Sequence, residues 1–278
     1  MTEILTCQLT NRGILRIGGE HRHVFLQGLI SNDINLCTAD HALYATLLTP
    51  QGKFLHDMFV TDGGDHFLID CERDRVDDLL KRLMAFKLRA KVTFENVTDR
   101  FDVWATWGHA IPTKPHWHED PRFPALGVRG IVGKGQPVEG QYADLTAYDK
   151  HRLVLGVPDG SRDMLVEKST LLECNVDLLN GISWTKGCYM GQELTARMHY
   201  RALVKKRLFP FRLIGEAPAP GSRLTFNHED VGEMRSSCDG FGLALVNIEK
   251  AQAAIAEGIT FAYEDTKLNP YQPEWLRA

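Results

Sequence analysis

The sequence has little that would mark a zinc, disulfide-bonded or membrane protein. It has six cysteines, but none forms a CxxC pair or has zinc-finger spacing with histidines. No apolar run could span a membrane, because charged residues interrupt the longest runs every few positions. Residues 1–7 lack the basic and apolar stretches of a secretory leader and the composition of a transit peptide. We therefore expect a cytoplasmic protein, without a membrane partner, whose thiols stay reduced.

The sequence also lacks an excess of either charge, internal repeats and low-complexity tracts. Its formal net charge is -4 and its pI is about 6.3, which gives no general footprint for nucleic acid. Of its 278 residues 44% are hydrophobic, which is enough for a sizeable core. These values are typical of a globular protein, and we expect a monomer that does not bind nucleic acid directly.

The first half of the chain alternates between strand and helix patterns. The clearest helix is residues 76–83, where apolar residues recur at i, i+3, i+4 and i+7. A turn at residues 49–52, with Pro and Gly, joins two apolar strands. The predicted order is strand (13–17), helix (20–29), strands (42–48, 54–60, 66–71), helix (76–83) and strands (92–94, 103–107). This order indicates an α+β fold with ferredoxin-like halves.

The second half of the chain has different sequence patterns. Residues 109–124 are rich in Pro and His and are predicted to form a loop. Residues 144–155 have a helical pattern that Gly156 should end. From residue 207 onward, short alternating runs are separated by Gly and Pro, which indicates a small antiparallel barrel. We therefore expect an α+β region over residues 1–205, made of two intertwined subdomains, and a C-terminal β-barrel domain over residues 206–278.

Residues 186–197, Lys-Gly-Cys-Tyr-Met-Gly-Gln-Glu-Leu-Thr-Ala-Arg, form the most informative segment. Gly187 and Gly191 bracket Cys188, so this cysteine is predicted to lie on a tight, exposed turn before a helix that begins near Gln192. A helix start and the neighbouring Lys186 would both favour the thiolate, which is the form that attacks and binds metal. The other interpretation is a buried cysteine in an ordinary glycine turn.

Residues 186–193 resemble the signature Lys-Gly-Cys-Tyr-x-Gly-Gln-Glu of the YgfZ branch of the GcvT-like superfamily. This branch includes CAF17-like and Iba57-type iron–sulfur cluster assembly factors. The resemblance extends over nearly the whole chain. Further segments that resemble family motifs are residues 26–33, 50–57, 152–158 and 231–245.

The resemblance implies a GcvT-like ring of three domains and a folate-binding accessory protein for the assembly, maturation or repair of [4Fe–4S] proteins. It implies tetrahydrofolate as cofactor and Cys188 as the reactive residue, a candidate ligand to a transient iron–sulfur cluster shared with an A-type carrier or a client protein. An effect on tRNA modification would be indirect. The residues that it implies as supporting the motif are Lys186, Gly187, Tyr189, Gly191, Gln192, Glu193 and Arg197. Those that it implies for folate binding are Asn32, Asp33, Asp57, Arg152 and Trp184.

A second function stays open, since the superfamily includes the folate-dependent aminomethyltransferase of glycine cleavage. That enzyme has adjacent aspartates where this chain has His56 and Asp57, and a glutamate where it has Val154. Both departures remove polar groups that would bind the folate, so we lean against this activity.

Two further clusters allow both a structural and a functional interpretation. The basic residues between Arg197 and Arg207 could be a solvated face, or could attract the glutamate tail of folate or an acidic partner. His116, His118 and Glu119 could bind a metal, but surface histidines are far commoner.

Overall fold

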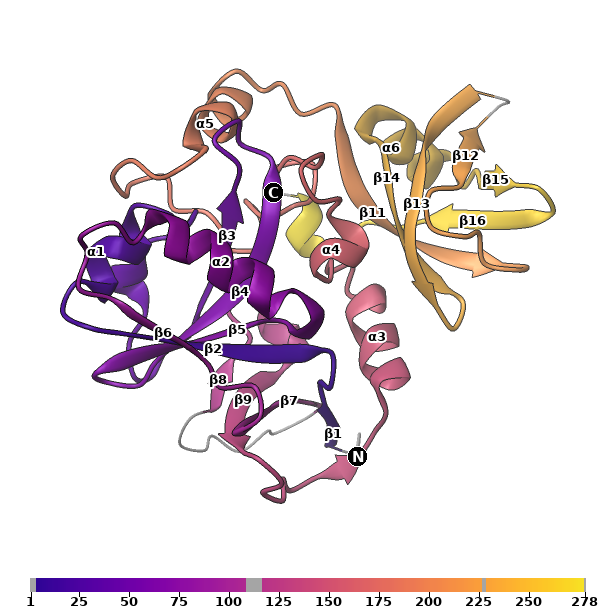
Figure 1. Cartoon of the computed structure of the whole chain (residues 1–278). Helices are drawn as coiled ribbons and strands as arrows, with labels where there is room; N and C mark the ends of the chain where they lie inside the picture. Colours follow the sequence, from indigo (N-terminus) through magenta and orange to yellow (C-terminus); the bar gives the residue numbers. More distant parts are fainter. Residues whose placement is uncertain (1–3, 109–116, 227–228, 278) are drawn as a thin grey trace. The chain divides into compact units, whose positions relative to one another are not determined.

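The computed structural model describes residues 4–108, 117–226 and 229–277 (Figure 1). The chain divides into two compact units. Unit 1 consists of residues 1–145 and 179–192, and unit 2 of residues 146–178 and 193–278. The segment 179–192 therefore returns to unit 1 after the chain has already entered unit 2. This return matters for the site, because it contains Cys188.

Unit 1 contains a five-stranded antiparallel sheet in the order β3-β4-β5-β2-β6. Its strands are β2 (Arg12–Gly18), β3 (Leu43–Leu48), β4 (Phe54–Asp62), β5 (His66–Glu72) and β6 (Thr93–Asn96). Its helical segments are α1 (Arg22–Gln27), η1 (Ile34–Leu36), η2 (Arg73–Arg75) and α2 (Val76–Phe86). Helix α2 buries Val76, Leu79 and Leu83. It packs beside β2 and β6.

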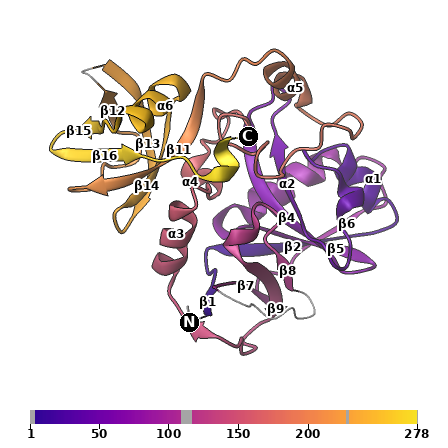
Figure 2. The same ribbon diagram turned by 180° about the vertical axis from the view of Figure 1, so that it is seen from behind.

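A second five-stranded sheet of unit 1 has the order β10-β1-β7-β9-β8. Its strands are β1 (Leu5–Gln8), β7 (Phe101–Trp107), β8 (Trp117–Glu119), β9 (Val128–Gly133) and β10 (Gln141–Tyr142), and η3 (Pro124–Leu126) precedes β9. Figure 2 shows β1, β7, β8 and β9 from behind. The two sheets meet at an ion pair in which Arg129 Nη2 of β9 lies 2.5 Å from Asp70 Oδ2 of β5.

Strand β4 is buried on both of its faces, which explains why it has almost no polar alternation. Successive side chains of a strand point to opposite faces. His56 accordingly contacts Asp78 of α2, at 2.8 Å from Nε2 to Oδ2. Asp57 contacts Arg12 of β2 instead, at 3.6 Å from Oδ1 to Nη1.

The described part of unit 2 contains helices and a closed six-stranded barrel. The helices are α3 (Leu145–Val154), α4 (Gly160–Asp163), α5 (Gln192–Tyr200) and α6 (Ile248–Glu257), with η4 (Glu274–Arg277) at the end. The barrel order is β11-β14-β13-β12-β15-β16. Its strands, orange to yellow in Figure 1, are β11 (Lys206–Ile214), β12 (Arg223–Phe226), β13 (Glu229–Cys238), β14 (Phe241–Asn247), β15 (Phe261–Tyr263) and β16 (Thr266–Pro270). The barrel core is apolar, with Phe211 and Phe226 both packed on Phe261.

Helix α3 ends where the sequence predicts. Gly156 has a positive φ of 77°, and the nitrogen of Val157 donates to the oxygen of Arg152 at 2.9 Å. The last carbonyl groups of the helix receive side-chain donors from the C-terminal segment of the chain. Tyr271 Oη donates to the oxygen of Val154 at 2.9 Å, and Trp275 Nε1 donates to that of Leu155 at 2.8 Å.

The α+β class and the C-terminal barrel are confirmed. The division into units differs from the boundary expected at residues 205 and 206, because residues 146–178 and 193–205 cluster with the barrel. One contact between residues 146–178 and the barrel joins Arg207 of β11 to Asp177, at 2.8 Å from Nη2 to Oδ2. Sequence patterns could not show it, because the pairing joins segments thirty residues apart.

Candidate functional site

All six cysteines lie in the described part of the chain, and they differ in exposure. Cys238 is partly exposed, and its Sγ donates to the oxygen of Thr146 at 3.5 Å. Cys188 is exposed, whereas Cys7, Cys37, Cys71 and Cys174 are buried. Burial raises the pKa of Cys7 to about 11 and that of Cys174 to about 12, which disfavours the reactive thiolate. Cys188 is therefore the thiol that a partner protein can reach most directly.

The segment that contains Cys188 lies against residues 28–33 of the same unit. Asn32 Nδ2 donates to the oxygen of Asn180 at 2.7 Å, and Ser31 Oγ donates to that of Gly181 at 2.6 Å. Beyond the cysteine, the nitrogen of Met190 donates to the oxygen of Gly28 at 3.1 Å. The structure thus joins two segments that the sequence presented as separate family motifs.

Lys186 is the polar anchor of this segment. Its Nζ donates to the oxygens of Ile30 and Asn32, both at 2.7 Å, and lies 5.1 Å from the centre of the Tyr189 ring. Burial lowers the pKa of Lys186 to about 8, and the negative charge of Asp33 opposes this shift. We expected Lys186 to support the motif. In the structure, its ammonium group binds two backbone carbonyl groups.

The two glycines beside Cys188 differ in their surroundings. Gly191 has a positive φ of 79°, and a Cβ atom there would lie 2.4 Å from the oxygen of Thr49. It therefore packs on the turn between β3 and β4, where no side chain fits. Gly187 has open space within 4 Å of an added Cβ and no positive φ. Only Gly191 is thus required by the backbone.

Helix α5 begins at Gln192, as expected, so Cys188 lies four positions before it. Gln192 closes the loop, because its Oε1 accepts from the nitrogen of Tyr189 at 3.2 Å. Tyr189 is buried, whereas Glu193 and Arg197 are exposed on α5 in unit 2. The loop therefore has anchors on both sides of Cys188 and leaves that residue exposed.

Three of the five residues expected to bind folate are almost fully enclosed: Asn32 is 5% exposed, Asp57 2% and Arg152 1%. The amide nitrogen of Asn32 donates to the oxygens of Tyr44 and Asn180. Asp33 is partly exposed, and its carboxylate accepts from the nitrogen of Asn35 at the start of η1. Trp184 is half-buried. In this arrangement the enclosed groups do not fit direct contact with folate, which would require them to leave their present partners.

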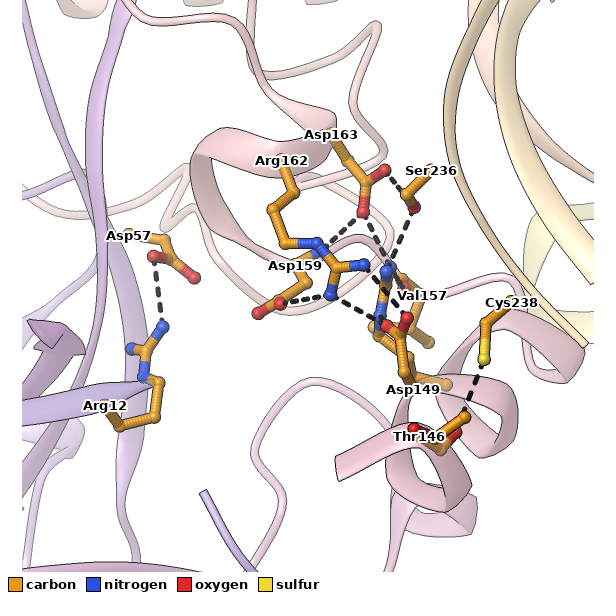
Figure 3. Close-up of polar contacts among 11 residues, drawn as sticks. Arg12, Asp57, Thr146, Asp149, Val157, Asp159, Arg162, Asp163, Ser236 and Cys238 are labelled. Carbon is orange, nitrogen blue, oxygen red and sulfur yellow. Dashed lines mark hydrogen bonds and ion pairs between the residues drawn. The ribbon is translucent and has the colours of Figure 1, made fainter. Parts of the chain in front are cut away.

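Arg152 is the centre of a buried network in unit 2. Figure 3 labels its partners Asp149, Asp163 and Ser236. Arg152 Nη1 lies 2.6 Å from Asp163 Oδ2 and its Nε lies 2.6 Å from Asp149 Oδ1. Its Nη2 donates to Ser236 Oγ at 3.0 Å, and Asp163 Oδ1 accepts from the same hydroxyl at 2.5 Å. The nearby carboxylates raise the pKa of Arg152 against the effect of burial. The contacts join α3, α4 and β13, which favours a structural role for Arg152.

Sequence reasoning missed a second buried network, in unit 1. Asp70 lies 2.6 Å from Arg12 Nε and 2.5 Å from Arg129 Nη2. The guanidinium groups of Arg12, Arg122 and Arg129 all lie over the Phe59 ring, at 5.4, 4.8 and 3.9 Å. Asp57 belongs to this network through Arg12, as Figure 3 shows. No motif could reveal it, because its members come from five separate segments.

His56 and Asp57 lie on opposite faces of β4, so an aspartate at position 56 would point to α2 rather than beside Asp57. Burial lowers the pKa of His56 to about 4, and the charge of Arg75 acts in the same direction. His56 is therefore neutral near pH 7 and donates a hydrogen bond to Asp78. The histidine at position 56, where the aminomethyltransferase has an aspartate, therefore contacts α2 and does not lie beside Asp57.

Among the described residues, no group of three or more His, Cys, Asp or Glu side chains could hold a metal ion. His116 lies outside the described residues, so the suggested cluster with His118 and Glu119 stays untested. No helix in the described ranges is long and apolar enough to cross a membrane. An iron–sulfur cluster at Cys188 would therefore need further ligands from another molecule.

The fold and the barrel define the class of protein. The aminomethyltransferase T of the glycine cleavage system from Bartonella henselae has a similar structure, with a TM-score of 0.76, and the match covers 99% of this chain and 86% of that chain. At 13% identity this likeness shows the fold alone. Residues 205–278 match the family model of the CAF17 C-terminal β-barrel domain. The chain thus has a GcvT-like fold with a CAF17-type barrel.

Two curated relatives identify the family within this class. The mitochondrial iron–sulfur cluster assembly factor IBA57 of Mus musculus is 33% identical, over 88% of this chain and 78% of the relative. IBA57 of Homo sapiens is also 33% identical, over 89% of this chain and 79% of the relative. This chain belongs to the IBA57 family of iron–sulfur cluster assembly factors.

The expected cytoplasmic location is wrong. The relatives from Mus musculus, Homo sapiens, Coccidioides immitis and Mycosarcoma maydis are all named as mitochondrial proteins. The expectation rested on the lack of an apolar run that could span a membrane and on the composition of residues 1–7. Targeting signals are read separately from the fold, so that composition was a poor guide to the compartment.

Proposed function

We propose that Cys188 provides one thiolate ligand to an iron–sulfur cluster during its assembly, and that an A-type carrier or a client protein provides the others. The observation that carries the proposal is the exposure of Cys188 on a loop anchored on both sides, while four other thiols are buried. Thiolate is the usual protein ligand of such clusters. Membership of the IBA57 family supports iron–sulfur assembly as the process.

The loop determines what this single thiol can do. Metal binding requires the thiolate, so coordination releases the thiol proton to solvent or to a partner. One thiolate cannot hold a cluster, and unit 1 places no second exposed cysteine beside it. The cluster is thus a shared cargo that can leave with the partner. The anchors at Lys186 and Gly191 hold the loop in one position before the partner arrives, which reduces the ordering cost of binding.

No step of this proposal runs through tetrahydrofolate, because Asn32, Asp57 and Arg152 are enclosed in protein contacts. The same enclosure gives no support to an aminomethyltransferase reaction. A turnover assay with tetrahydrofolate and an aminomethyl donor would separate that activity from iron–sulfur assembly.

The test compares Cys188→Ala with Cys238→Ala in a deletion strain. Cys238 is the matched control, because it is the next most accessible thiol. We expect Cys188→Ala to lose the activity of a [4Fe–4S] client enzyme and Cys238→Ala to retain it. Both variants should keep the wild-type midpoint of unfolding. Normal activity of the client enzyme in the Cys188→Ala strain would contradict the proposal.

A further inference from the structure

Unit 2 presents an exposed basic segment at the end of α5 and the start of β11. Its cations are Arg197, Arg201, Lys205 and Lys206, all exposed. None of the four makes an ion pair with a described residue. Elsewhere in unit 2, Arg162 pairs with Asp149 and Lys250 pairs with Glu229, whereas the exposed Lys168 and Lys267 are single cations in the sequence and not part of a basic run.

Two exposed apolar side chains lie among these cations. Tyr200 is 72% exposed and Leu203 is 48% exposed. We call the six side chains the basic strip; they are Arg197, Tyr200, Arg201, Leu203, Lys205 and Lys206. The strip contains no acidic residue, although the whole chain has a formal net charge of -4.

The backbone of the basic strip is fixed by hydrogen bonds. Ala202 has a φ of 49°, its nitrogen donates to the oxygen of His199, and the nitrogen of Leu203 donates to that of Met198. This pattern is a Schellman motif, which ends the helix at a defined residue. Lys205 is held next, because its oxygen accepts from the nitrogen of Ile248 at 3.0 Å. The cations therefore extend from an ordered backbone.

We propose that the basic strip docks a carboxylate-rich face of the protein that shares the cluster at Cys188. This inference rests on the proposed function and names the chemistry of the partner. Four unpaired cations gain most from carboxylates, which steer the approach of a partner and set its orientation. Tyr200 and Leu203 favour a protein surface over a free anionic tail, because protein interfaces combine aromatic and apolar contacts with charge. In the sequence, Arg197 follows Cys188 by nine positions.

The test measures binding of a purified, cluster-free A-type carrier at low and high salt, about 50 and about 300 mM. The strip variant is Arg201→Glu/Lys205→Glu/Lys206→Glu. Its matched control is Arg89→Glu/Lys168→Glu/Lys267→Glu, which reverses the same number of exposed cations that lack an ion pair with a described residue. At low salt we expect the strip variant to bind at least about tenfold more weakly and the control to stay within about twofold. The wild-type affinity should fall at high salt.

Equal weakening in both variants, or unchanged binding by the strip variant, overturns the proposal. So does a wild type that shows no salt-sensitive binding of the carrier. A hexaglutamate peptide tests the other anionic ligand: if the strip variant loses this peptide but keeps the carrier, the strip serves a folate tail instead. Arg201→Gln/Lys205→Gln/Lys206→Gln replaces the reversal variant if that one unfolds. Docking of the cluster-free carrier does not depend on the Cys188 thiolate. A negative result for the basic strip therefore does not affect the outcome of the Cys188→Ala test.

Discussion

The ammonium nitrogen of Lys186 lies 2.7 Å from the carbonyl oxygen of Asn32, and this contact ties the cysteine loop to the loop after α1. More than 150 residues separate the two positions in the sequence. The same nitrogen donates to the oxygen of Ile30. The backbone of residues 30–32 therefore holds the Cys188 loop in position.

Replacing Lys186 tests whether these two hydrogen bonds hold the loop. Lys186→Met removes both hydrogen bonds and should lower the free energy of unfolding by about 1 to 3 kcal/mol. Client activity should fall as well, because Cys188 is no longer held in position. Urea unfolding and complementation measure the two effects. Lys168→Met, at an exposed lysine, is the control and should match the wild type. Full client activity in Lys186→Met would show that the anchor is dispensable.

The glycines beside the cysteine give a matched pair. Gly191→Ala should destabilise the protein by about 1 to 3 kcal/mol, because φ is positive and the added Cβ would meet the oxygen of Thr49. Gly187→Ala meets nothing within 4 Å and should unfold like the wild type. Thermal unfolding of the two variants checks this, and similar midpoints would contradict the packing of Gly191 on the β3–β4 turn.

His56 should make stability depend on pH. Its pKa in the folded protein is about 4, against about 6.5 in the unfolded chain, so the unfolded chain binds more protons between these values. The His56 contribution is thus complete above about pH 6.5 and is lost as pH falls toward 4. It amounts to on the order of 3 kcal/mol. His56→Gln should remove this part of the pH dependence in urea unfolding from pH 7 to 4. An unchanged pH profile would contradict the burial of a neutral histidine.

The network of unit 2 predicts a stability effect at Arg152. Arg152→Met leaves Asp163 buried without its cation, which should cost about 3 to 5 kcal/mol. Arg162→Met is the control, because Arg162 is exposed, and should cost less than about 1 kcal/mol. Urea unfolding separates them. If Arg152→Met unfolds like the wild type, the structural role of Arg152 is contradicted and the expected ligand-binding role is favoured.

Several local features could be predicted from sequence because short segments contain their causes. The apolar spacing of residues 76–83 specified α2, and Gly156 specified the end of α3. The strands β1, β8, β9 and β10 were not predicted. Three of them are short, with four residues in β1, three in β8 and two in β10, and β1 pairs with β7 and β10, which lie far along the chain. The helix from Gln192 was predicted correctly, but the anchors of the loop before it were not, because they lie on residues 28–33.

Residue types along the chain were enough to recognise the family signature, to predict that Cys188 lies on an exposed turn, and to predict a C-terminal barrel. These features depend on residue types at fixed local spacing. The folded chain was needed to show that Lys186 holds backbone carbonyls, that Gly191 and not Gly187 is required, and that Asn32, Asp57 and Arg152 are enclosed. The physical reason is that burial and pairing depend on residues brought together by the fold, and residue spacing along the chain does not contain that information.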